Sequence, residues 1–446
     1  MASNLPAELL IFIFSIATYN TIRDADYTAN PPFLAVLREK EDDKLNDEAL
    51  KTKAAISTVC SFWRHLNLEF MYEDIIIRHG SKALVDVLEN GVQTPIITQA
   101  TTAGLGHFVR RIQLSTMYTA ASGFDIHPKS LPWYQLIGRE TARILRSCPN
   151  IIHLERRRDL YCRPSEFISD YLPRERNTVF EDLRDIQLTN IMRIDWDGGF
   201  MPQVYRNGIA ESDNNYFPRC FTESQSLRVL ALSGTAWGTN WRLSSPQLKT
   251  VYLNAIDFLD IVTLGSDANP KYDIPGLSRV VLRHRNSSTH PLIRANSYHI
   301  RTIEIDRNLF FLTPRGTTEA AQLLHVCPNL EELFYPVFFV RLMHIAVIQN
   351  SPLKKLRIVG LHAVPNPARD VSDIVQLIIA QHLSVLCSPE SPFVALREIR
   401  LCGDEWGSVC MLEGFKDAES LVRSRGIMLV KEGSHTATEP KRSNVL

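Results

Sequence analysis

The pattern of apolar and polar positions divides the chain into two regions that follow different rules. From about Pro6 to Thr18 nearly every residue is apolar, so a helix there would carry apolar side chains on all sides. Pro6 suits the first turn of a helix, and Glu8 complements the positive end of the helix dipole. Beyond residue 100 the apolar positions become periodic instead. The sequence therefore predicts an N-terminal helix that needs cover on every side, followed by repeated strands.

A polar stretch separates this helix from a second helical segment. Residues 19–46 contain two adjacent prolines and a mixed-charge run, which predict an inserted surface loop with a short helix around residues 33–39. Residues 47–70 regain apolar positions at helical spacing. We therefore expect a helix, a loop and a second helix at the amino end.

An apolar triad at positions 0, +3 and +5 recurs after residue 100, with starts 21 to 44 residues apart. On a short strand, positions +3 and +5 point to the same side, and position 0 packs where the chain turns into the strand. One such unit cannot bury its apolar face alone, so neighbouring units must stack. The triads are Val109/Ile112/Leu114, Ile151/Leu154/Arg156, Leu183/Ile186/Leu188, Leu227/Leu230/Leu232, Leu248/Val251/Leu253, Leu277/Val280/Leu282, Ile300/Ile303/Ile305, Leu330/Leu333/Tyr335, Leu353/Leu356/Ile358 and Leu396/Ile399/Leu401.

Segments between the triads have helical periodicity, and two of them end in matching sequence. LRSCPNIIHLE at residues 145–155 and LLHVCPNLEEL at residues 323–333 share Cys-Pro-Asn before a strand, where proline stops the helix. Near the carboxyl end, a helix over residues 414–425 is expected to stop at Gly426, before a strand at residues 427–430.

These patterns predict an α/β protein. Residues 1–78 would form a small helical domain interrupted by the loop at about 19–46, and residues 79–432 an irregular solenoid of short parallel strands and helices. Residues 433–446 are polar and are expected to be disordered.

Composition narrows the class of protein. The 446 residues carry 49 Lys plus Arg and 49 Asp plus Glu, so nothing in the charge balance favours a nucleic-acid partner. The eight cysteines are dispersed without a C-x-x-C pair, as in a reduced cytoplasmic or nuclear protein. The apolar run at residues 9–17 lacks a basic leader and is too short to span a bilayer, so we expect no membrane association.

A search for catalytic chemistry finds little. The sequence has no G-x-S-x-G, H-E-x-x-H or Walker-type motif, and Gly104-Leu105-Gly106 is an isolated fragment. We therefore expect no enzyme activity, no cofactor and no metal site. Cys60 is interpreted as a small buried hydrophobe and not as a reactive thiol.

Two short segments near the amino end resemble a known motif. Leu5-Pro6-Ala7-Glu8-Leu9 followed by Ile13-Phe14, and then Val59-Cys60-Ser61-Phe62-Trp63-Arg64, resemble the opening and the close of the F-box in fungal F-box-like proteins. In this chain the polar insertion separates the two halves. The resemblance implies a three-helix unit that binds the Skp-type adaptor of a cullin ubiquitin ligase. The adaptor contacts that it implies are Leu5, Pro6, Leu9, Ile13, Val59, Cys60 and Trp63.

The triads resemble leucine-rich repeats, with one departure. The family usually places an Asn eight positions from the first apolar residue, and here only the unit that starts at Ile300 has it, as Asn308. We therefore expect an irregular solenoid.

Aromatic residues after two triads are the candidates for binding a protein client. They lie in polar segments that would follow strand ends, where exposed aromatics form binding hot spots. The alternative is that they fill gaps in an irregular solenoid. The candidates are Trp196, Tyr205, Tyr216, Trp237 and Trp241.

Three hypotheses remain open. The chain is a substrate receptor of a ubiquitin ligase, or an interaction scaffold whose N-terminal helices only cap the repeats, or an α/β enzyme. The enzyme ranks last because the triads repeat evenly and a cofactor loop is absent.

Overall fold

The structure is a computed structural model in which the chain forms two compact units. The first unit comprises residues 1–30 and 36–277, and the second comprises residues 31–35 and 278–446. The structure describes residues 5–19, 23, 34–77, 82–90, 104–116, 140–158, 186–197, 224–233, 243–253, 272–282, 291–305, 325–336, 353–362, 382–389, 391, 393–403, 406–411 and 413–432. The predicted disordered tail at residues 433–446 lies outside this part of the chain.

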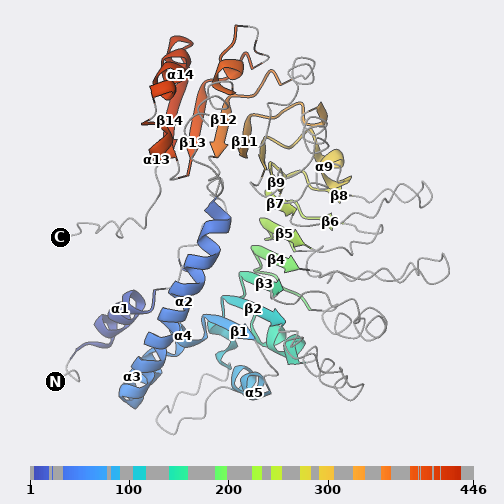
Figure 1. The fold of residues 1–446 in the computed structure, drawn as a ribbon. Coiled ribbons are helices and arrows are strands. Elements are labelled where there is room, and N and C mark those ends of the chain that lie inside the picture. The colour runs from blue at the N-terminus through green and yellow to red at the C-terminus, as the bar shows by residue number, and fades with distance from the viewer. Residues whose placement is uncertain are drawn as a thin grey trace, which may run out of the picture. The chain divides into compact units, whose positions relative to one another are not determined.

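Four helices open the chain and are called the helical module below: α1 (Ala7–Ala17), α2 (Leu34–Val59), α3 (Ser61–Leu66) and α4 (Leu68–Tyr72) (Figure 1). Helix α2 corrects the prediction, because the mixed-charge run is part of a 26-residue helix and not of a loop. The loop prediction rested on two prolines and on the charged residues. The prolines precede Leu34, where proline is compatible with a helix start, and a mixed-charge run is equally compatible with a solvent-exposed helix.

The expected second helix is also divided at Cys60. That residue has an extended backbone, and its sulfur accepts the Trp63 backbone N–H at 3.4 Å, which starts α3. Cys60 is exposed, so its interpretation as a buried hydrophobe is wrong.

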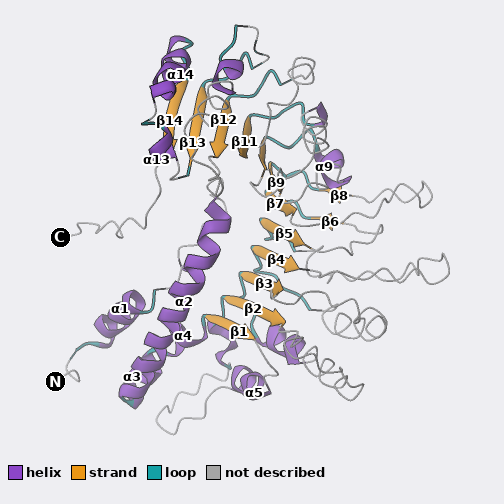
Figure 2. Cartoon of the chain, in the orientation of Figure 1, coloured by secondary structure: helices purple, strands orange, loops and turns teal. Residues whose placement is uncertain are grey.

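The first unit contains parallel strands that follow one another in chain order, as Figure 2 shows. Their central apolar residues stack in register: Ile112 pairs with Leu154, then Ile194, Leu230 and Val251. Strand β1 joins the helical module directly to β2. The strands are β1 (Asp74–Ile77), β2 (Arg111–Thr116), β3 (His153–Arg158), β4 (Arg193–Asp197), β5 (Val229–Ser233) and β7 (Thr250–Leu253), with β6 (Leu243–Ser244) and β8 (Tyr272–Asp273) as a separate pair.

The second unit repeats the same arrangement. Its strands are parallel and their apolar residues again stack, from Val280 through Ile303 and Leu333 to Val359 and Ile399. Its elements are β9 (Arg279–Leu282), α9 (Pro291–Asn296), β10 (Thr302–Ile305), β11 (Glu332–Pro336), β12 (Ile358–His362), β13 (Glu398–Cys402), α13 (Trp406–Val409), α14 (Glu413–Ser424) and β14 (Met428–Glu432). The two units together confirm an α/β body of stacked parallel strands.

The end of α14 follows the sequence prediction. Gly426 has φ of 69°, a left-handed conformation that glycine adopts without strain, and β14 follows two residues later.

Two of the predicted triads have the wrong register. The strand expected at Leu183/Ile186/Leu188 is β4, whose triad is Ile191/Ile194/Trp196. The unit expected at Leu353/Leu356/Ile358 is β12, whose triad is Leu356/Val359/Leu361. A further buried position lies three residues before each triad, and Leu188 and Leu353 occupy it. At β12 it reproduces the three-residue spacing one step early, whereas at β4 the predicted triad ends on this position and so starts eight residues too early.

Asparagine does bridge the repeats, but from a different position than the leucine-rich-repeat pattern suggests. The side-chain amide of the residue before the triad donates to a backbone carbonyl of the preceding unit: Asn150 to His107 at 2.8 Å, Asn190 to Pro149 at 3.0 Å and Asn329 to Tyr298 at 2.8 Å. Asn150 and Asn329 are the asparagines of the two Cys-Pro-Asn segments. The shared sequence therefore marks a shared structural bond, with the cysteine buried before it.

A close backbone approach explains the isolated Gly-Leu-Gly fragment. The 3₁₀ helix η3 (Leu105–Phe108) passes so near its neighbours that a Cβ on Gly106 would lie 1.8 Å from the carbonyl oxygen of Ser147. A Cβ on Gly104 would lie 1.9 Å from the carbonyl oxygen of Leu88, in helix α5 (Lys82–Asn90). These glycines serve packing and not the binding of phosphate.

Candidate functional site

The helical module is apolar on two opposite sides, and only one of them is packed. Leu10 and Phe14 of α1 lie in a core with Ile56 and Phe70, where the Phe14 and Trp63 rings meet edge to face at 5.1 Å. The other side of α1 faces outward. The large apolar side chains exposed on α1 or beside it are Leu5, Leu9, Ile11, Phe12, Ile13, Ile16 and Tyr19, and those exposed on α2 or at the start of α3 are Leu45, Leu50, Val59 and Phe62.

The residues predicted to bind an adaptor can now be placed. Leu9 and Ile13 are 49% and 47% exposed, one helical turn apart on α1. The remaining candidates divide as follows: Leu5, Pro6, Val59 and Cys60 are exposed, and Trp63 is half-buried against Phe14. Since α1 and α3 are in contact, the two halves of the motif lie together despite the insertion between them.

Sequence analysis missed part of this surface. Phe12 and Ile16 are 61% and 62% exposed, more than any predicted adaptor residue of α1, and Phe62 is also exposed. The signal was present in the apolar run itself, but a run that is apolar all round does not show which side the fold will cover.

A buried charge cluster fixes the helical module to the sheet. The Glu73 carboxylate accepts hydrogen bonds from Lys53 at 2.8 Å and from Arg23 at 2.6 and 2.7 Å. Arg23 also donates to the backbone carbonyl of Ser15 in α1, and its guanidinium lies 4.7 Å from the Phe70 ring centroid. Arg23 belongs to the segment that was predicted to be a surface loop. This residue of the insertion therefore holds part of the module in place.

The predicted client-binding aromatics receive a correction at Trp196. Its side chain is 4% exposed, because it occupies the +5 position of the β4 triad and points into the core. It is not an aromatic residue exposed on a loop. Tyr205, Tyr216, Trp237 and Trp241 lie outside the described residues.

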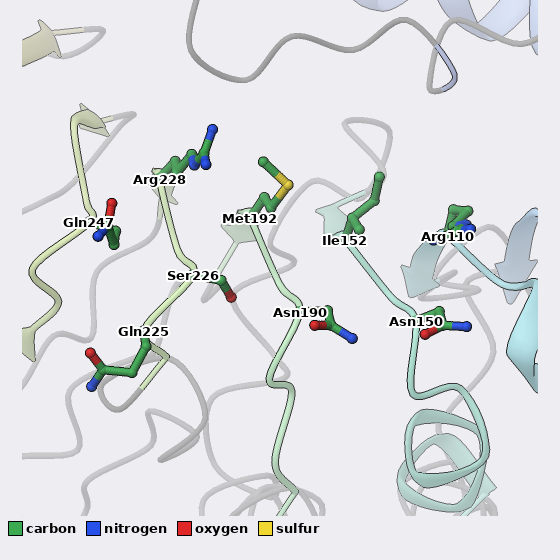
Figure 3. Close-up of a pocket in the computed structure, with 9 residues that line it drawn as sticks. All are labelled: Arg110, Asn150, Ile152, Asn190, Met192, Gln225, Ser226, Arg228 and Gln247. Carbon is green, nitrogen blue, oxygen red and sulfur yellow. The ribbon is translucent and has the colours of Figure 1, made fainter.

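The first unit has a shallow groove of about 580 Å³ at the N-terminal edge of its strands (Figure 3). Arg110, Ile152, Met192 and Arg228 form one row, each placed immediately before its strand. Amide and hydroxyl side chains form the rest of the lining: Asn150, Asn190, Gln225, Ser226 and Gln247. Sequence analysis missed this groove, although a basic or apolar residue at position +1 of each triad was its signal.

Charges on the neighbouring strand positions neutralise one another. Arg111 pairs with Asp74, while Asp195 accepts hydrogen bonds from His153 at 2.7 Å and from Arg193 at 2.8 Å. Burial acts to raise the pKa of the Asp195 carboxyl, but the Arg193 charge and the His153 hydrogen bond outweigh it and hold that pKa well below its usual range. Asp195 is therefore an ionised structural group and not a proton donor.

Burial controls the protonation of two of the described thiols. Burial raises the pKa of the Cys148 and Cys327 thiols to about 12, so both remain protonated at neutral pH. No group of three His, Cys, Asp or Glu side chains placed to hold a metal ion occurs among the described residues. In the same part of the chain, no helix is long and apolar enough to cross a membrane.

Comparison with known proteins adds little to these observations. No family model matches the chain. No curated protein matches it either. A crystal structure of a TLR13–ssRNA13 complex aligns over 66% of this chain with 12% identity and a TM-score of 0.31. The aligned part spans only 32% of that chain, and a similarity of this size does not establish a shared fold.

Proposed function

We propose that this chain is a non-catalytic, substrate-recruiting F-box subunit of a Skp-cullin-F-box ubiquitin ligase. The helical module would bind a Skp-type adaptor, through it a cullin, and the strand units would bind a protein client. One observation carries the proposal: the apolar residues of α1 and of the α2–α3 junction stay exposed, although the opposite side of the same helices is well packed. Exposed apolar patches of this kind mark protein-docking surfaces.

The energetic argument rests on where the apolar side chains lie. Full burial of a large apolar side chain stabilises a protein or complex by roughly 1.5–3 kcal/mol. Several half-exposed side chains would therefore contribute further stabilisation if a partner buried them. Leu9, Phe12, Ile13 and Ile16 are all in this state. A partner that covers them would provide that stabilisation, as in complexes where a helix docks into an apolar groove.

A capping role for the helices is the second candidate, and one contact favours it. Helix α4 packs against β1 and η3, so the module covers the first strand of the sheet. This contact uses α4, and it does not account for the outward side of α1. Capping therefore explains the position of the module and leaves its exposed apolar residues unexplained.

The test is co-purification with a Skp-type adaptor. The full chain should retain a co-expressed adaptor, and a Leu9→Asp/Ile13→Asp variant should lose it, because both carboxylates would be buried without partners. The matched control is Val394→Asp/Met411→Asp, which places two carboxylates on apolar residues that are 79% and 81% exposed in the second unit. Absence of adaptor from the wild-type preparation would refute the assignment, as would equal retention by all three proteins.

A further inference from the structure

The groove of the first unit has a regular geometry along its row of side chains. The backbone N–H of Ile152 donates to the carbonyl of Arg110, that of Met192 to Ile152, and that of Arg228 to Met192, each at 2.8 Å. These bonds place the four residues on successive strands at the same level of the sheet. Neighbouring strands are about 4.8 Å apart, so the backbones of Arg110 and Arg228 are about 14 Å apart.

Arg110 and Arg228, at the two ends of the row, have no acidic partner in the described part of the chain. Asp74 and Asp195 on the adjacent strand positions are already paired. Ile152 and Met192 between the arginines are half-buried and apolar. The row therefore presents a cation, an apolar centre and a second cation.

We propose that this groove binds an extended acidic peptide segment that crosses the strands. An extended peptide advances about 3.3 Å per residue, so two carboxylates four residues apart would be about 13 Å apart and would reach both arginines. A central apolar side chain would then contact Ile152 and Met192. The amides of Asn150 and Asn190, which donate one hydrogen bond each within the protein, keep oxygen atoms that can accept peptide N–H groups.

A nucleic acid fits this pattern less well than a peptide. A polynucleotide carries a phosphate at every step and is held by a continuous basic track, whereas the two middle positions of this row are apolar. The acid-apolar-acid segment would be the feature recognised in the client, and this role rests on the function proposed above.

The experiment measures binding of labelled peptides to the full chain by fluorescence anisotropy. The probe contains the core Asp-Ser-Leu-Ser-Asp, and the comparison peptides have Asn in place of both Asp residues or bring the two Asp residues two positions closer. We expect the first peptide to bind at least tenfold more tightly than either of the others. Its affinity should weaken as salt rises from about 50 to 300 mM, because both end contacts are ionic.

Matched variants assign the binding to the groove. Arg110→Glu/Arg228→Glu should weaken binding at least tenfold. Arg357→Glu/Arg397→Glu should stay within about twofold, since these exposed arginines occupy the same repeat position before β12 and β13 of the second unit. Equal loss in both variants would overturn the proposal. So would equal affinity for the three peptides, or tighter binding of a labelled oligodeoxythymidylate.

The peptide-binding test and the adaptor co-purification test can fail independently of each other. The Leu9→Asp/Ile13→Asp variant should bind the acidic peptide with unchanged affinity, and the Arg110→Glu/Arg228→Glu variant should still retain the adaptor. If the adaptor is never retained but the peptide binds, only the ligase assignment fails. If the adaptor is retained and the peptide does not bind, only the groove proposal fails.

Discussion

The helical module and the strand units differ in how completely they bury their apolar residues. In the strand units the triad residues are almost all fully buried, and the groove edge is largely polar. In the module, one helix has both Phe14 in the core and Phe12 facing outward. A fold that can bury apolar residues completely in one region does not need to leave them exposed in another. This difference is the basis of our proposal that a partner covers the outward side of the module.

The largest expected effect separates the two sides of α1. Phe14→Ala should lower the free energy of unfolding by about 3–5 kcal/mol, because it opens a cavity beneath Trp63. Phe12→Ala should change it by less than about 0.5 kcal/mol and should reduce adaptor retention instead. Urea unfolding and co-purification measure the two effects. A large loss of stability from Phe12→Ala would mean that the outward side is structural.

A comparable effect is expected where the module joins the sheet. Glu73→Ala leaves the buried Lys53 ammonium and the Arg23 guanidinium without their carboxylate, at a cost of about 3–5 kcal/mol. The control is Glu89→Ala, which breaks an exposed pair with Arg143 and should cost less than about 1 kcal/mol. Urea midpoints that shift equally in both variants would contradict a structural role for the cluster.

The contribution of the ionised Asp195 side chain to stability should depend on pH. The folded pKa of Asp195 is lowered, so its stabilising contribution is complete above the ordinary carboxyl value near 4 and is lost as pH falls toward the folded value. At pH 7, Asp195→Asn should cost about 1.5–3 kcal/mol, and the difference from wild type should shrink in acid. Asp417→Asn, on the exposed side of α14, should cause no comparable loss at pH 7. Urea unfolding at several pH values measures both.

The smallest expected effect concerns the asparagine that bridges adjacent repeats. Asn329→Ala removes its hydrogen bond to the Tyr298 carbonyl and should cost about 1 kcal/mol. Lys355→Ala removes only the exposed contact to the Asn329 side-chain oxygen and should be nearly neutral. Thermal unfolding can distinguish the two, and equal effects would show that the carbonyl bond contributes nothing.

Sequence reasoning worked where one physical rule decides the structure. The triads at Ile112, Leu230 and Ile303 lie on strands, because apolar residues at +3 and +5 share one face of a strand. It went wrong where two rules coincide. The buried position before each triad matches the first residue of the predicted triad at β12 and the last residue of the predicted triad at β4. The error at β4 moved Trp196 from the core to a supposed loop.

Other features depend on contacts between distant residues and could not be obtained from local pattern. Arg23 lies fifty positions from Glu73, and its ion pair is visible only once α1 and β1 are placed. The groove requires that residues from four successive repeats align. The bridging asparagines were within reach, because Asn150 and Asn329 precede their triads in matching sequence, but the family pattern drew attention to another position.

Glu73 has one more property, which concerns mechanics. Its side chain holds α2 through Lys53, while its backbone carbonyl accepts the N–H groups of Arg110 and Arg111 at the start of β2. A single residue thus links α2 to the start of β2, at the level of the sheet where the groove begins. Through this link, the position of a peptide bound at Arg110 would be coupled to that of a partner bound at α1, because both sites connect to the same carboxylate residue.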